Sequence, residues 1–93
     1  MTVGILSLQL GVYDSFSLKD KRRAIKSVKD RIAHRYNVSV AEVAMLDTLR
    51  HGVLGVAMVS NDHAYVEGAL SQIVDFVRTM HQADLEDYSI EFV

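Results

Sequence analysis

The chain of 93 residues contains no cysteine, no proline and no tryptophan. Without cysteine it can form neither a disulfide nor a thiolate metal site, which fits a reducing compartment, and we expect a cytoplasmic location. No stretch approaches the roughly eighteen consecutive apolar residues that a membrane-spanning helix requires. Residues 1–12 are apolar but lack the basic start and the cleavage site of a signal peptide. We therefore expect a single domain over residues 1–93 that is not associated with a membrane.

Patterns that carry known chemistry are also missing. The four histidines are spread through the chain, and no two of them occupy i, i+4 positions of a helix, so a metal site is not expected. The five glycines are scattered and form no P-loop, no nucleophile elbow and no glycine-rich phosphate cradle. We predict no catalytic residue, no metal ligand and no cofactor, and we expect that the protein is not an enzyme.

The hydrophobic pattern alternates between strand and helix periods. Every second residue of the segment 6–12 is apolar, which predicts a first strand over residues 2–13 with one buried face. Ser17 is a good N-cap for a helix that continues to about Tyr36, and Asn37 is expected to end that helix in a left-handed conformation. The remaining predicted elements are a strand over residues 38–46 with an irregularity near Glu42, a turn over 47–52, a strand over 53–60 in the centre of the sheet, a helix that follows Asn61 and Asp62 and ends near His81, and a final strand over 88–92.

The order β-α-β-β-α-β, with two halves of similar length, predicts a ferredoxin-like α+β fold with a four-stranded antiparallel sheet and both helices on one face. Two known functions of this fold are disfavoured by the residues. Acylphosphatases use an Arg in the loop after the first strand, whereas residues 11–17 contain no Arg, so an acylphosphatase-like hydrolase is a remote alternative. RNA-recognition motifs stack bases on aromatic side chains of the central strands, and residues 53–60 contain none.

Positive charge is concentrated in one segment of the chain. Eight of the ten Lys and Arg residues lie between Lys19 and Arg35, whereas ten of the twelve acidic residues lie outside this segment. Residues 17–36 carry a formal charge of +6, and the rest of the chain carries −8. Such a local cation on a small domain is typical of proteins that bind phosphate-rich partners, of which nucleic acid is the commonest.

Part of this charge gathers on one side of the predicted helix, which we name the basic face. Its members, on a helical projection, are Lys19, Arg22, Arg23 and Lys26, with Lys29 at the edge. Only Asp30 interrupts this face, so the cations mostly lack partners within the helix and repel one another. We predict that the basic face contacts phosphates; the alternative is a solvated helix surface without a ligand. Arg31 and Arg35 have a structural explanation, because cations near a helix end complement its dipole.

Several segments together resemble the YlxP-like family of small bacterial proteins over nearly the whole chain. These segments are Ser-Leu-Lys-Asp-Lys-Arg-Arg at 17–23, Asn-Val-Ser-Val-Ala-Glu-Val at 37–43, Val-Ser-Asn-Asp at 59–62 and Ile-Glu-Phe at 90–92. The resemblance implies a ferredoxin-like fold and no established activity. Genes of this family often neighbour those of a translation initiation factor and a ribosome-binding factor, which implies a role around ribosome maturation or RNA. Family members often carry Asp-His-Gln-Asp and a Trp after the second strand, whereas residues 44–49 of this chain keep only Asp47.

Two hypotheses for the function follow. The preferred one is a small non-enzymatic domain that associates with RNA or a ribosomal particle, with the basic face contacting phosphates. The alternative is an oligomerising interaction module or a small-ligand-binding module without a nucleic-acid role. In that case the open sheet face would pair with a second subunit to form a homodimer, and the candidate contact residues are Val3, Ile5, Val53 and Val59.

Overall fold

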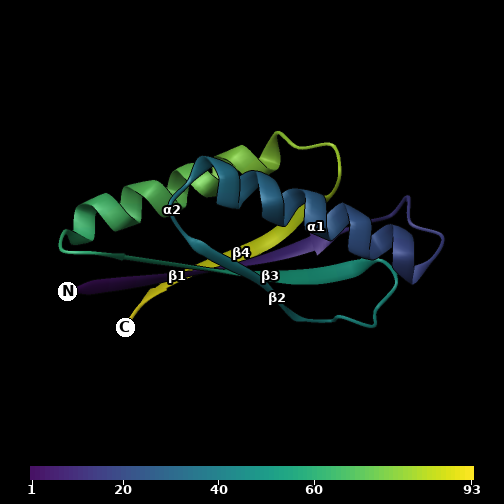
Figure 1. The fold of residues 1–93 in the computed structure, drawn as a ribbon, viewed down its shortest axis with the longest axis horizontal. Coiled ribbons are helices and arrows are strands. Elements are labelled where there is room, and N and C mark those ends of the chain that lie inside the picture. Colours follow the sequence, from purple (N-terminus) through teal and green to yellow (C-terminus); the bar gives the residue numbers. More distant parts are fainter.

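The computed structural model describes all 93 residues and has four strands and two helices in the order β-α-β-β-α-β. The elements are β1 (Thr2–Gly11), α1 (Leu18–Arg35), β2 (Ser39–Ala44), β3 (His51–Ser60), α2 (His63–Arg78) and β4 (Asp84–Phe92). The strands form one antiparallel sheet in the order β2-β3-β1-β4, and both helices cover the same face of it (Figure 1). The predicted ferredoxin-like α+β fold and the central position of the third strand are therefore confirmed.

The core lies between the sheet and the two helices. On β1 the leucines at alternate positions point toward the helices and are fully buried, as are the matching residues of β3. The apolar stripes of both helices close this core from above. The buried side chains of the central strands and helices are Leu6, Leu8, Leu10, Leu54, Val56, Met58, Ile25, Val28, Ile32, Val66, Leu70, Ile73, Val74 and Val77. Each large side chain buried in this way contributes about 1.5–3 kcal/mol of transfer free energy.

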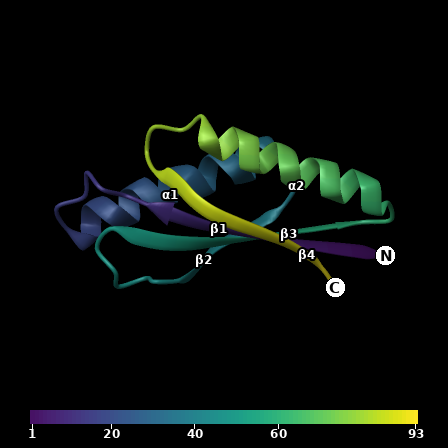
Figure 2. The ribbon, with the colours of Figure 1, turned by 180° about the vertical axis from the view of Figure 1, so that it is seen from behind.

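The opposite face of the sheet has no helix over it, because alternation along a strand sends every second residue to that side. Val3, Ile5 and Val53 are half-buried there, and Val59 is exposed. Figure 2 shows the same layering from behind, with the helices on one side only. We call this surface the open sheet face.

Element boundaries differ from the sequence predictions mainly at the edges of the sheet. β4 begins at Asp84 instead of residue 88, because a register shift against Gln9 and Leu10 of β1 interrupts the alternation that would reveal it. β2 ends at Ala44 instead of residue 46, and the predicted irregularity is present as a register shift between Glu42 and Ala44.

The remaining boundaries differ less. β1 ends at Gly11 instead of residue 13, β3 begins two residues before residue 53, and α2 ends at Arg78, short of the predicted end near His81. The prediction that Asn37 ends α1 in a left-handed conformation is wrong. Tyr36 closes the helix with extended dihedral angles, φ −123° and ψ 146°, and its N–H donates to the Ile32 carbonyl.

Three loops meet at one end of the molecule. The turn from β1 to α1, the loop from β2 to β3 and the loop from α2 to β4 all lie opposite the end that carries both termini (Figure 1). The N–H of Val12 donates to the Arg50 carbonyl at 2.8 Å, which ties the first two of these loops together. The N-terminus of α1 therefore lies beside the β2–β3 loop. Neither helix has the length and the apolar character needed to cross a membrane.

Candidate nucleic-acid interface

The basic face lies on the outer surface of α1 because the other side of the helix is buried. Ser17 begins the helix as predicted, since its Oγ accepts a hydrogen bond from the Asp20 N–H at 3.1 Å. From that start, Ile25, Val28 and Ile32 face the core. The opposite side of α1 carries the five predicted site residues, which are exposed except for the half-buried Lys29. The structure thus brings the five residues together on one surface.

Three of these cations lack a carboxylate partner within the chain: the exposed Lys19 and Arg23, and the half-buried Lys29. Neither Lys19 nor Arg23 takes part in any of the ion pairs of the structure. Both side chains lie in the first two turns of α1, close to the free N–H groups of the helix start. Asp20 lies in the same first turn but forms no ion pair with either cation, so both are free to meet an external anion.

Two others are paired, which the helical projection did not fully anticipate. Lys26 Nζ lies 2.5 Å from Asp30 Oδ2, four residues further along α1, and this hydrogen bond lowers the pKa of Asp30. Arg22 lies 3.5 Å from Asp47, which comes from the β2–β3 loop. All four side chains are more than half exposed, and pairs as exposed as these contribute little and are screened by salt. The basic face is therefore less positive than the helix alone indicates, yet its paired cations can change partners.

Lys21 is the one cation of this segment that the structure removes from the surface. Its side chain is fully buried, and its Nζ donates to Glu42 Oε2 at 2.6 Å, to the Met45 carbonyl at 2.8 Å and to the Leu46 carbonyl at 3.3 Å. These contacts satisfy the three donors of the ammonium group. Lys21 is four residues before Ile25, so it lies on the core stripe of α1, and this spacing is the signal by which the sequence could have revealed its burial. The residue holds the β2–β3 loop against the helix.

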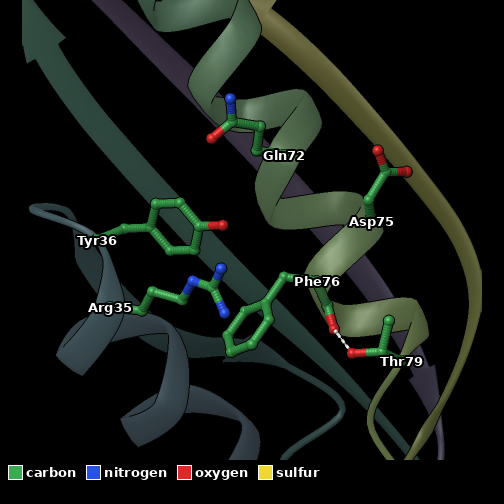
Figure 3. Close-up of a pocket in the computed structure, with 6 residues that line it drawn as sticks. All are labelled: Arg35, Tyr36, Gln72, Asp75, Phe76 and Thr79. Atoms are coloured by element: carbon green, nitrogen blue, oxygen red, sulfur yellow. Dashed lines mark hydrogen bonds between the residues drawn. The ribbon is translucent and has the colours of Figure 1, made fainter.

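A groove between the C-terminal part of α1 and α2 contains residues that the sequence analysis did not select. Three adjoining cavities of about 400, 300 and 520 Å³ follow this groove, and Arg35 lines all of them. The Arg35 guanidinium carbon lies 4.7 Å from the centroid of the Phe76 ring and 5.9 Å from that of Tyr36. Figure 3 shows the guanidinium between these two rings, and Gln72 lies on α2 further along the same cavity. The contact between Arg35 and Phe76 depends on how α1 and α2 pack against each other, which no local sequence pattern reveals.

A polar cluster lies where β1, β3 and β4 come together near the three loops. The Tyr13 hydroxyl donates to Glu86, and His51 Nδ1 lies 3.0 Å from the other carboxylate oxygen. The rings of Tyr13 and His51 meet edge to face, with centroids 5.7 Å apart. Both hydrogen bonds lower the pKa of Glu86, and the one from Tyr13 is the larger cause. The hydrogen bond between Tyr13 and Glu86 also raises the pKa of Tyr13. The histidine and acidic side chains of the chain form no group of three that could hold a metal ion.

Fold and surface together define a small ferredoxin-like domain with a basic helix and an open sheet face. Residues 3–90 match the family described as "Protein of unknown function (DUF503)". The chain is also 31% identical over 75 residues to the protein described as "Uncharacterized protein YlxP" of Bacillus subtilis strain 168, across 81% of this chain and 82% of that protein. The chain therefore belongs to this family, and the resemblance noted in the sequence is confirmed.

Among solved structures, the de novo designed protein Foldit4 is similar. It superposes with a TM-score of 0.55 and 11% sequence identity, over 100% of this chain and 97% of the design. At this level of identity the likeness concerns the fold alone. The arrangement of strands and helices is thus one that a designed sequence also adopts.

Proposed function

We propose that the protein is a small non-enzymatic domain of the cytoplasm that binds RNA, free or within a ribosomal particle, through the basic face of α1. The observation that carries this proposal is the pair of unpartnered cations, Lys19 and Arg23, on an exposed helix surface. Two neighbouring like charges without a counter-ion repel each other, and a phosphate backbone removes that repulsion.

The distribution of acidic residues supports the same orientation. β4, at the edge of the sheet that lies away from β2, carries Asp84, Glu86, Asp87 and Glu91, whereas α1 packs against β2. The two ends of the sheet therefore differ in charge. A polyanion approaching such a dipolar molecule is steered toward α1 and away from β4.

A salt titration of RNA binding tests the proposal. A fluorescently labelled RNA is titrated with the wild-type protein, with the double variant Lys19→Ala/Arg23→Ala and with Arg78→Ala, which removes an exposed cation from α2 as a control. We expect log K to fall with log salt by about 0.7 to 0.9 per phosphate contact, and the double variant to lose affinity together with part of that slope.

The control Arg78→Ala is expected to bind like the wild type. Wild-type protein that binds no RNA at low salt, or a double variant that binds as tightly as the wild type, would refute the proposal. Co-sedimentation of the tagged protein with ribosomal particles, at low and at high salt, then tells free RNA from an assembled particle.

A second candidate function is self-association through the open sheet face, and the exposed apolar side chains there favour it. Val59 and Val43 are 62% and 58% exposed, and a shallow apolar cavity of about 240 Å³ lies between Ile5 and β2. In a two-fold dimer this same surface would be buried on both copies. Light scattering over micromolar concentrations tests it. A dimer that Val59→Glu dissociates is the expected result, and a wild-type monomer throughout would exclude a stable dimer.

A further inference from the structure

The groove between α1 and α2 combines a fixed positive charge with aromatic surfaces. Arg35 has no carboxylate partner within the chain, and its guanidinium is held against the Phe76 ring at 4.7 Å. An arginine remains protonated at every physiological pH, so this charge is permanent. Stacking on Phe76 restricts the side chain before any ligand arrives, which lowers the entropy lost when it binds one. The remaining donors of the guanidinium are available to an anion.

The groove offers two hydrogen-bonding side chains that nothing in the chain uses, Gln72 on α2 and Tyr36 at the end of α1. The side-chain hydrogen bonds of the protein involve neither the Gln72 amide nor the Tyr36 hydroxyl. Both residues line the central cavity and are drawn in Figure 3. An amide presents a donor and an acceptor side by side, which is the arrangement that reads the edge of a nucleobase. The groove therefore combines aromatic rings on which a nucleobase can stack with an amide that can bind the edge of that base.

Two acidic residues line the groove, Asp75 in the central cavity and Asp30 in an adjoining one, and each has a cation other than Arg35 as its partner. The Asp75 carboxylate points away from Arg35 in Figure 3 and lies 3.7 Å from Arg78, and Asp30 is held by Lys26. Arg31 and His34 extend the same wall of α1 beyond Arg35. A negatively charged ligand therefore meets cations on the α1 side of the groove, and on the α2 side it meets neutral groups and one carboxylate, Asp75, that is paired with Arg78.

We propose that this groove binds a nucleotide unit, with the phosphate on Arg35 and the base against the stacked side chains, its edge toward Gln72. The central cavity, about 400 Å³, has the size of small-ligand sites. This inference deepens the proposed function, because a single strand of RNA held by the basic face can place an unpaired base in the groove. Arg23 and Arg35 are twelve residues apart on α1, about 18 Å along the helix axis. The same chemistry is present in a free mononucleotide.

Three probes distinguish a base of an RNA strand from a free nucleotide as the ligand of the groove: an unstructured single-stranded RNA, a duplex RNA of equal length, and AMP. The variants are Phe76→Leu, which keeps apolar volume but removes the ring, Gln72→Ala, and Arg35→Gln. Arg50→Gln, at an exposed arginine that lines none of the groove cavities, is the charge-matched control for Arg35→Gln. We expect Phe76→Leu and Arg35→Gln each to weaken single-strand binding about tenfold, since base stacking on a side chain is of that order. Duplex binding should be unchanged in Phe76→Leu and Gln72→Ala, and circular dichroism verifies that each variant is folded.

Nuclear magnetic resonance of the Gln72 side-chain amide gives an independent result. If AMP shifts this signal, the groove binds free nucleotides. If single-stranded RNA shifts it and AMP does not, the groove binds a base of the RNA strand. If Phe76→Leu and Gln72→Ala bind single strands as the wild type does, Lys19→Ala/Arg23→Ala does not, and AMP leaves the Gln72 signal unshifted, the groove proposal is overturned and the proposed function stands. If no RNA binds, the proposed function fails, and the groove proposal then holds only if AMP shifts the Gln72 amide.

Discussion

Lys21 on α1 and Glu42 on β2 form a buried ion pair, with 2.6 Å between Nζ and Oε2. The lysine is fully buried, and the glutamate side chain is 18% exposed. The same ammonium group binds the carbonyls of Met45 and Leu46, where the backbone turns out of β2 and Met45 takes a left-handed φ of 59°. A single side chain thus fixes the loop that stands beside the N-terminus of α1.

Removing the lysine should destabilise the fold strongly. In Lys21→Met, the carboxylate of Glu42 and two backbone carbonyls lose their donor, and breaking a buried pair in this way costs about 3 kcal/mol. Urea denaturation of the variant measures the loss. Lys19→Met, an exposed change of the same kind, is the control and should stay within about 0.5 kcal/mol of the wild type. Equal stability of the two variants would show that the buried pair does not hold the loop.

Two glycines should respond to alanine in opposite directions. A Cβ atom on Gly4 would lie 2.5 Å from Val66 Cγ1 and 2.8 Å from Leu70 Cδ1, because α2 packs closely on β1 there. Gly4→Ala should therefore cost about 1–3 kcal/mol through overpacking. Gly68, exposed in the middle of α2, has no atom within 4 Å of such a Cβ, and Gly68→Ala should stabilise by about 0.5–1 kcal/mol. Thermal unfolding of both variants gives the comparison, and a shift of the same sign in both would contradict it.

The Tyr13–Glu86 contact should make stability depend on pH. The hydrogen bonds from Tyr13 and His51 lower the pKa of Glu86, so the ionised carboxylate stabilises the fold above the ordinary carboxyl pKa, and this contribution is lost as the pH falls through the lowered value. In Tyr13→Phe, the pKa of Glu86 should rise toward its usual range, as a carboxyl titration by nuclear magnetic resonance can show. His51→Gln should raise it less, because the Tyr13 hydrogen bond is the larger cause.

The same contact acts at alkaline pH with the opposite sign. Glu86 raises the pKa of Tyr13, so the neutral hydroxyl stabilises the fold below the usual tyrosine pKa and ceases to do so as the pH rises through the raised value. The stability difference between wild type and Tyr13→Phe should therefore be largest near neutral pH. A difference that is constant from strongly acidic to strongly alkaline solution would exclude this origin.

Asp30 should act as a competitor of RNA. Its carboxylate holds Lys26 at 2.5 Å and interrupts the basic face. Asp30→Asn releases the lysine and removes a negative charge, so we expect RNA affinity to rise about threefold, with a steeper salt dependence. Glu91→Gln changes the charge equally on β4, away from α1, and should leave binding unchanged. Weaker binding by Asp30→Asn would place the RNA on another surface.

Much of the fold follows from local patterns, and the site follows only in part. The alternation in β1 and the Ser17 cap depend on neighbours in the sequence, so they were predictable. The sequence groups Lys21 with the surface charge because its partner, Glu42, lies on another element, and only its place on the core stripe indicates its burial. Arg35 was explained by the helix dipole, whereas its contact with Phe76 depends on the packing of two helices that are far apart in the chain.

The position of β1 in the sheet has a consequence for the order in which the chain folds during synthesis. β1 pairs with β3 on one side and with β4 on the other, and Gly4 lies opposite Phe92. Because β1 is synthesised before β4, it keeps one edge open until β4 emerges from the ribosome. Until then, a nascent chain exposes unpaired N–H and C=O groups beside its row of leucines, an edge to which other chains can add. The acidic β4 closes that edge and replaces it with one that repels its own copies.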